Sequence, residues 1–160
     1  MKPLAQEVSI HDNRVLAYEV DAERRQITLR TRFDNQQPPE YTDVVFEKVL
    51  AYHFEGDDFA TILLDIEEIL LDQLVERNAE LFDRMRRFPW PGAWNDSVEG
   101  CLAYFVSKGG RAFEITSACG MDGWVIAGAC RFEITNAKPG AVPISLDTGQ
   151  EGADRCQRAR

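Results

Sequence analysis

The segment from Tyr52 to Asp58 places a histidine beside three carboxylates, a combination that could hold a metal ion. On a strand, His53 and Glu55 would share one face, and Asp57 or Asp58 could complete a site for a divalent cation. The same residues suit a polar sheet face that runs into an acidic turn, and we favour this second interpretation. A small metal-dependent hydrolase using His53 and the nearby carboxylates is the enzymatic alternative.

The other histidine, His11, is followed directly by Asp12, and a histidine beside a carboxylate can act as a general base. Metal phosphohydrolases that use such a pair need several further histidines, whereas this chain has two in all. We therefore expect Asp12 and Asn13 to shape the backbone at the start of the first strand.

The cysteines are spaced too widely for the usual structural zinc motifs. They are Cys101, Cys119, Cys130 and Cys156, and the smallest separation is the eleven positions from Cys119 to Cys130. We expect all four thiols to be reduced. Cys119, in a turn with two glycines, should be the exposed one, but the sequence assigns it no base. We predict no metal, no cofactor and no catalytic residue.

Acidic residues are concentrated between Glu55 and Asp83. This stretch holds ten acids and one base, Arg77, so it carries nine negative charges, which equals the net charge of −9 of the whole chain. Such a local field can attract a basic partner, although a solvated outer face would have the same composition. The acids that we predict to contact a partner are Glu55, Asp57, Asp58, Glu67, Glu68, Asp72, Glu76 and Glu80.

Two tryptophans lie in the proline- and glycine-containing segment 88–94, FPWPGAW. Aromatic residues in such a connection either pin the loop to the core or form an exposed anchor, and tryptophan is common at binding hot spots. We therefore include Trp90 and Trp94 among the candidate partner-binding residues.

Hydrophobic periodicity predicts the elements that must position these side chains. Period-two alternation or turn-bounded apolar runs predict strands at 14–20, 26–33, 43–55, 61–69, 111–117 and 123–134. Helical spacing predicts helices at 70–88 and 96–108. The chain should therefore be α+β, with a mainly antiparallel sheet of about six strands in the order ββββααββ, packed against two helices.

The same patterns predict which side chains are buried and where elements end. In 61–69, Ile62, Leu64 and Ile66 should point inward, and Lys48 should mark a bend or bulge in 43–55. The core should include Leu74, Leu81, Phe82 and Phe105, and the second helix should bury Val98, Cys101, Leu102, Phe105 and Val106. Asp96 with Glu99 resembles a capping box, and Gly109 with Gly110 should end that helix.

Length and composition predict one domain over residues 1–135 and a mobile tail over 136–160, which is rich in Gly, Pro, Asp, Gln and Arg. The net charge of −9 disfavours nucleic acid and anionic membrane surfaces as partners. We expect no secretory segment, and no apolar run approaches the roughly 20 residues that span a bilayer. A cytoplasmic location is the expectation.

The segments HDN, VVFEKVLAYHF and ILLDIEEI, within residues 10–69, resemble small bacterial proteins grouped with the immunity proteins of polymorphic toxin systems. The resemblance implies an acidic cytosolic protein that binds and blocks a toxin, with no catalytic residues of its own. We therefore expect a non-enzymatic protein-binding module whose acidic surface neutralises a basic toxin domain. A hydrolase built on His53 and a self-associating adaptor protein are the alternatives.

Overall fold

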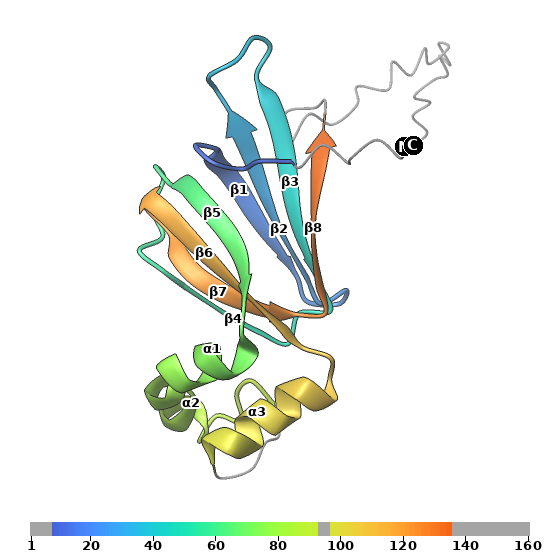
Figure 1. Cartoon of the computed structure of the whole chain (residues 1–160), viewed down its shortest axis with the longest axis vertical. Helices are drawn as coiled ribbons and strands as arrows, with labels where there is room; N and C mark the ends of the chain where they lie inside the picture. The colour runs from blue at the N-terminus through green and yellow to red at the C-terminus, as the bar shows by residue number, and fades with distance from the viewer. Residues whose placement is uncertain (1–7, 93–96, 136–160) are drawn as a thin grey trace, which may run out of the picture.

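The fold is α+β, as the sequence predicts, and is seen in a computed structural model that describes residues 8–92 and 97–135 (Figure 1). The strands are β1 (Arg14–Asp21), β2 (Gln26–Phe33), β3 (Glu40–Glu47), β4 (Ala51–Glu55), β5 (Ile62–Ile69), β6 (Arg111–Cys119), β7 (Asp122–Ala127) and β8 (Ala129–Thr135). The helices are α1 (Leu71–Arg77), α2 (Ala79–Met85) and α3 (Val98–Ser107). The predicted tail and Trp94 lie outside the described residues.

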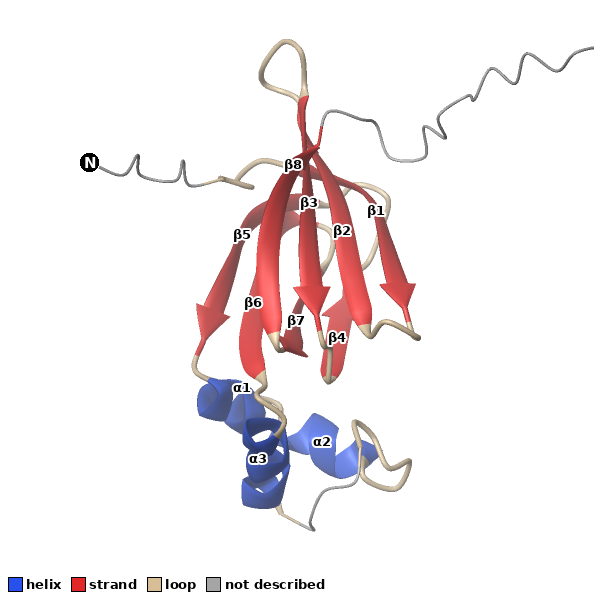
Figure 2. Ribbon diagram, turned by 90° about the vertical axis from the view of Figure 1, so that its right-hand side faces the viewer, coloured by secondary structure: helices blue, strands red, loops and turns tan. Residues whose placement is uncertain are grey.

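The eight strands form one antiparallel sheet in the order β4-β7-β6-β5-β1-β2-β3-β8, which is folded into two layers (Figure 2). One layer contains β4, β7, β6 and β5, and the other contains β1, β2, β3 and β8. At the β5–β1 step the ladder consists of a single pair, Arg14 with Ile62. The two layers therefore face each other, and the helices lie at one end of them.

Two hydrophobic clusters hold this arrangement together. The first lies between the layers and joins Ile27, Leu29, Val44 and Phe46 to side chains of β5, β6 and β7. The Phe46 ring, for example, lies 5.8 Å from that of Phe113. The second cluster packs the three helices against side chains of β4, β6 and β7, including Trp124 and Ile126.

The predicted strand 43–55 is two strands, so the prediction of about six strands was too low. Lys48, where a bend was predicted, has a φ of 54°, and the chain crosses there from one layer to the other. The predicted strand 123–134 is divided in the same way, at Gly128, into β7 and β8. Three residues, 48–50, separate β3 from β4, and Gly128 alone separates β7 from β8. Because these corners are short and apolar residues lie on both sides of them, alternation alone does not reveal the break.

In β5 the predicted inward set is partly wrong. Leu63 is fully buried and Leu64 is 38% exposed, whereas Ile66 is buried as predicted. The pairing of β5 with β6 shifts register between Ile62 and Leu63 and again between Leu63 and Asp65. These irregularities change which residues face the core, since alternation holds only within an uninterrupted strand.

The predicted helix 70–88 is also divided, at Asn78. The Asn78 side chain donates from Nδ2 to the Leu74 carbonyl oxygen at 2.9 Å and accepts at Oδ1 from Nε1 of Trp124 at 3.1 Å. An asparagine that binds both the backbone and the sheet favours a helix end over a helix interior. Leu74 and Phe82 are buried as predicted, but Leu81 is half-buried.

The third helix begins one residue later than the predicted cap. Ser97 is the N-cap, and its hydroxyl oxygen accepts from the Gly100 amide at 3.1 Å. Asp96 lies outside the described residues. Gly109, with a φ of 70°, follows the helix end as predicted. Cys101 and Phe105 are buried, but Val106 is 61% exposed and does not belong to the buried stripe.

Replacing Phe82 with alanine should lower the free energy of unfolding by about 3–5 kcal/mol. Phe82 is fully buried, and its ring packs against those of Trp90, Phe105 and Trp124. Urea denaturation measures the effect. Two variants provide the comparison. Leu81→Ala should lower the free energy of unfolding by less than Phe82→Ala, because Leu81 is half-buried. Val106→Ala should change it by no more than about 0.5 kcal/mol, because Val106 is exposed. Equal losses in the three variants would contradict this assignment of the core.

Candidate functional site

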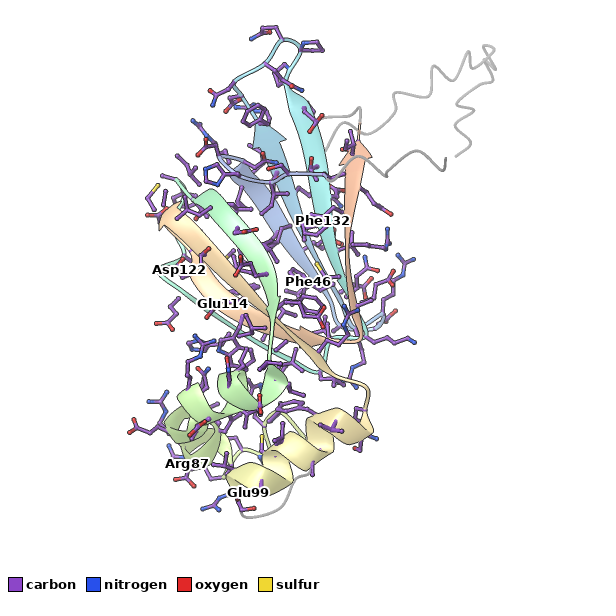
Figure 3. All side chains as sticks on the ribbon, in the orientation of Figure 1. Phe46, Arg87, Glu99, Glu114, Asp122 and Phe132 are labelled. Carbon is purple, nitrogen blue, oxygen red and sulfur yellow. The ribbon has the colours of Figure 1, made fainter. Side chains whose placement is uncertain are left out.

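An acidic cleft lies on the outer face of β4, β7 and β6, next to α1. Its volume is about 460 Å³, and its charged lining residues are Glu55, Arg77, Glu114 and Asp122. Figure 3 shows Glu114 and Asp122 on the side of this layer that faces away from Phe46 and the interior. We refer to this surface as the acidic cleft.

Strand register brings the carboxylates of the acidic cleft together. Glu55 at the end of β4 lies directly opposite Asp122 at the start of β7. Glu114 on β6 lies opposite Glu67 on β5. Glu67 does not line the hollow itself but shares its face of the sheet, and we include it in the acidic cleft. Residues opposite one another in an antiparallel pair share a face of the sheet, so each pair juxtaposes two negative charges.

Few positive charges offset these pairs. Nη1 of Arg77 lies 3.0 Å from Oε1 of Glu114, and Arg77 is the only base among the described residues that line the cleft. Asp122 accepts from the backbone amide of Ser117 at 2.7 Å, which fixes its carboxylate without neutralising it. Like charges on facing positions destabilise a sheet, so a cation entering the cleft would relieve repulsion.

Trp124 forms the floor between the acidic cleft and the helical cluster. It is buried, and its indole contacts the rings of Phe82 and Trp90 at 5.7 Å and 6.3 Å. The Trp90 ring also stacks on Phe82 at 5.6 Å. Trp90 therefore pins its loop to the core, one of the two roles that the sequence left open, while part of its surface remains accessible.

Asp57 and Asp58 lie elsewhere, on the connection between β4 and β5 that borders β1. The Tyr18 hydroxyl donates to Oδ2 of Asp57 at 2.7 Å, and this hydrogen bond raises the pKa of Tyr18. Asp58 accepts from the amide of Ala60 at 2.7 Å. These two acids therefore belong to a different surface from the acidic cleft.

Glu68 is matched by a base. The Arg111 guanidinium donates to both oxygens of Glu68, with Nε 2.7 Å from Oε1, and this pairing lowers the pKa of the carboxyl group. Asp72, Glu76 and Glu80 are exposed on α1 and α2. The predicted acidic stretch is thus not one surface. Some of its acids lie at the cleft, Asp57 and Asp58 lie beside β1, Glu68 is paired with Arg111, and others are on α1 and α2.

The histidines have neighbours that suit a structural role. Nδ1 of His53 is 3.7 Å from Oε1 of Glu55, and its ring stacks on Trp124 at 6.0 Å. His11 donates from Nδ1 to the Leu64 carbonyl oxygen at 2.9 Å. In residues 8–92 and 97–135, no three His, Cys, Asp or Glu side chains converge in a way that could hold a metal ion.

The described cysteines are free thiols, and two are poor nucleophiles. Cys101 is buried and Cys130 is half-buried, and burial raises the pKa of Cys101 to about 11 and that of Cys130 to about 12. A protonated thiol reacts slowly, so neither suits covalent catalysis at neutral pH. Cys119 is exposed, as predicted, and its sulfur contacts the Ala60 carbonyl oxygen at 3.1 Å. Cys156 lies outside the described residues.

Sequence reasoning missed Glu114 and Asp122, two of the four charged residues that line the cleft. Both fall outside the dense acidic stretch, in the predicted strand 111–117 and the turn before the next strand. Alternation in 111–117 does place Glu114 on the face opposite Phe113 and Ile115. The signal that was absent is register, because the sequence does not tell which residues of β5, β6, β7 and β4 lie opposite one another.

Comparison of the chain with protein-family models, with curated proteins and with solved structures finds no match. Among the described helices, none combines the length and apolar character required to cross a membrane.

The Glu68–Arg111 pair should contribute stability that is lost in acid. Because the folded protein lowers the pKa of Glu68, the contribution is present above the unfolded pKa and disappears as the pH falls through the folded value. Glu68→Gln should therefore cost less than about 1 kcal/mol at pH 7, since the pair is exposed. The cost should approach zero well below pH 4, near which a free glutamate titrates.

Urea denaturation of wild type and Glu68→Gln at several pH values measures this difference. An NMR titration of the Glu68 carboxyl group in Arg111→Ala is the control, because loss of the guanidinium should raise its pKa back toward the ordinary range of a glutamate. An identical Glu68 pKa with and without Arg111 would show that the pair does not perturb the carboxyl group.

Proposed function

We propose that the chain is a non-enzymatic protein-binding module that engages a basic partner through the acidic cleft, as an immunity protein engages its toxin. The observation that carries the proposal is the register that sets Glu55 opposite Asp122 and Glu67 opposite Glu114. Strand pairing thereby concentrates one acid from each of the four strands β4, β5, β6 and β7 on one face.

The arrangement favours a protein over a metal ion as the ligand. The carboxylates are distributed along the cleft and do not converge on one point within the described residues, as metal ligands would. Several lysine or arginine side chains could each meet a separate acid in such a cleft. The buried floor formed by Trp124 and its aromatic neighbours supports the acids on a rigid surface.

The partner can be identified by purifying the tagged chain from its own host and sequencing the proteins that remain bound. Each candidate is then produced in a test strain with and without this chain. The proposal expects a basic protein that arrests growth alone and is tolerated when this chain is present. A partner that is harmless by itself would exclude the immunity role while leaving protein binding in place.

Reversing two charges of the acidic cleft should slow association with that partner by about tenfold at low salt, because attraction between opposite charges raises association rates. The variant is Glu55→Lys with Glu67→Lys, measured by stopped-flow fluorescence. Dissociation should change less, and the effect should shrink near 0.15 M salt, where charges are screened over about 8 Å.

The matched control reverses Glu23 and Glu133 to lysine, which changes the net charge equally on the other layer. Glu23 lies in the β1–β2 turn and Glu133 on β8, so this variant tests total charge without altering the cleft. Equal slowing in both double variants would assign the effect to net charge, and an unchanged rate in the cleft variant would reject the cleft as the contact surface.

A further inference from the structure

One edge of β1 is unpaired over most of its length. The strand pairs with β2 from Arg14 to Asp21, but on its other side it pairs with β5 only at Arg14. The last backbone bond on that side is from the Val15 amide to the Thr61 carbonyl oxygen at 3.0 Å. From Ala17 to Asp21, no described strand occupies this edge, so its backbone donors and acceptors are available to another strand.

Two hollows border this open edge, and the second of them also reaches β4 at Ala51 and Tyr52. The first, of about 330 Å³, lies between the start of β1 and the β4–β5 connection and includes Leu16 and Met121 in its lining. The second, of about 370 Å³, lies beyond Val20 and includes Tyr52 and Trp90. Apolar side chains predominate among the lining residues of both hollows.

Tyr18 stands between the two hollows. Its ring packs edge-on against Phe54 of β4 at 5.6 Å, and its hydroxyl donates to Asp57. Tyr18 lines the first hollow and lies on the exposed part of β1. We call the surface between β1 and β4 the seam. It therefore has an apolar hollow on each side of the Tyr18 ring.

The seam is also acidic and carries an exposed aromatic anchor. Asp57 and Asp58 line the first hollow, and within the described residues neither forms an ion pair with a lysine or arginine, although both accept hydrogen bonds. Phe59 follows them and is fully exposed. This part of the seam therefore offers a ligand an apolar contact at Phe59 and two carboxylates without a basic partner among the described residues.

We propose that an extended, basic segment of another protein adds a strand to β1 between Ala17 and Asp21. Its backbone would bond to the open edge, alternate side chains would enter the two hollows, and lysine or arginine would face Asp57 and Asp58. A second copy of this chain is disfavoured because both copies carry a net charge of −9. The inference uses none of the residues of the acidic cleft and stands independently of it.

The test uses the full-length ¹⁵N-labelled protein and a capped peptide of alternating lysine and valine, Lys-Val-Lys-Val-Lys-Val-Lys, at low salt. We expect chemical-shift changes and slower amide exchange confined to Ala17–Asp21 and the β4–β5 connection. A peptide with proline in place of the central valine lacks one backbone donor and should bind more weakly. A peptide with glutamate in place of lysine should not bind.

Two variants that remove the same number of charges locate the contact. Asp57→Asn with Asp58→Asn keeps the hydrogen-bond acceptors and should weaken peptide binding by about fivefold, since each exposed ion pair contributes modestly. Glu80→Gln with Glu99→Gln, on α2 and α3, should leave the affinity within about twofold. Equal weakening in both variants, equal binding of the proline peptide, or shifts centred on the acidic cleft would each overturn the proposal.

Discussion

The fold depends on two chain corners that lie against each other, at Lys48 and Gly128. The Gly128 amide donates to the Glu47 carbonyl oxygen at 2.9 Å, and a Cβ at position 128 would lie 3.1 Å from that of Lys48. Because β3 pairs with β8 and β4 pairs with β7, the two segments turn together and stay paired on each side of the corner. The remaining strands extend these two pairs into the two layers.

This corner determines which face of the sheet is available for function. It places β4 and β7 in the layer with β5 and β6, whose inner face is covered by β2 and β3. Trp124 marks the boundary on the outer face, since it is buried against the helices while its strand neighbours in register are His53 and Glu114. Beyond that boundary the face stays open, and there the acidic cleft lies.

The alternation of apolar and polar residues was sufficient to predict a strand where the strand is regular and has one face toward the core. It predicted β2 from Gln26 to Phe33, in which Ile27 and Leu29 are fully buried, because no bulge or corner interrupts that strand. It failed where one residue changes the chain direction. Lys48 carries no sequence signal for a positive φ, since glycine and asparagine are the residues that usually adopt it.

The helical region and the cleft show two further limits of local patterns. Apolar spacing runs through Asn78 without a break, but the hydrogen bond of Asn78 with Trp124 depends on a residue 46 positions away. The partnership of Glu55 with Asp122 likewise depends on the pairing of β4 with β7. Such facing carboxylates couple partner binding to the stability of the fold. A basic side chain placed between two of them removes an electrostatic repulsion that is present in the free protein. A partner that neutralises the cleft should therefore also stabilise the sheet beneath it.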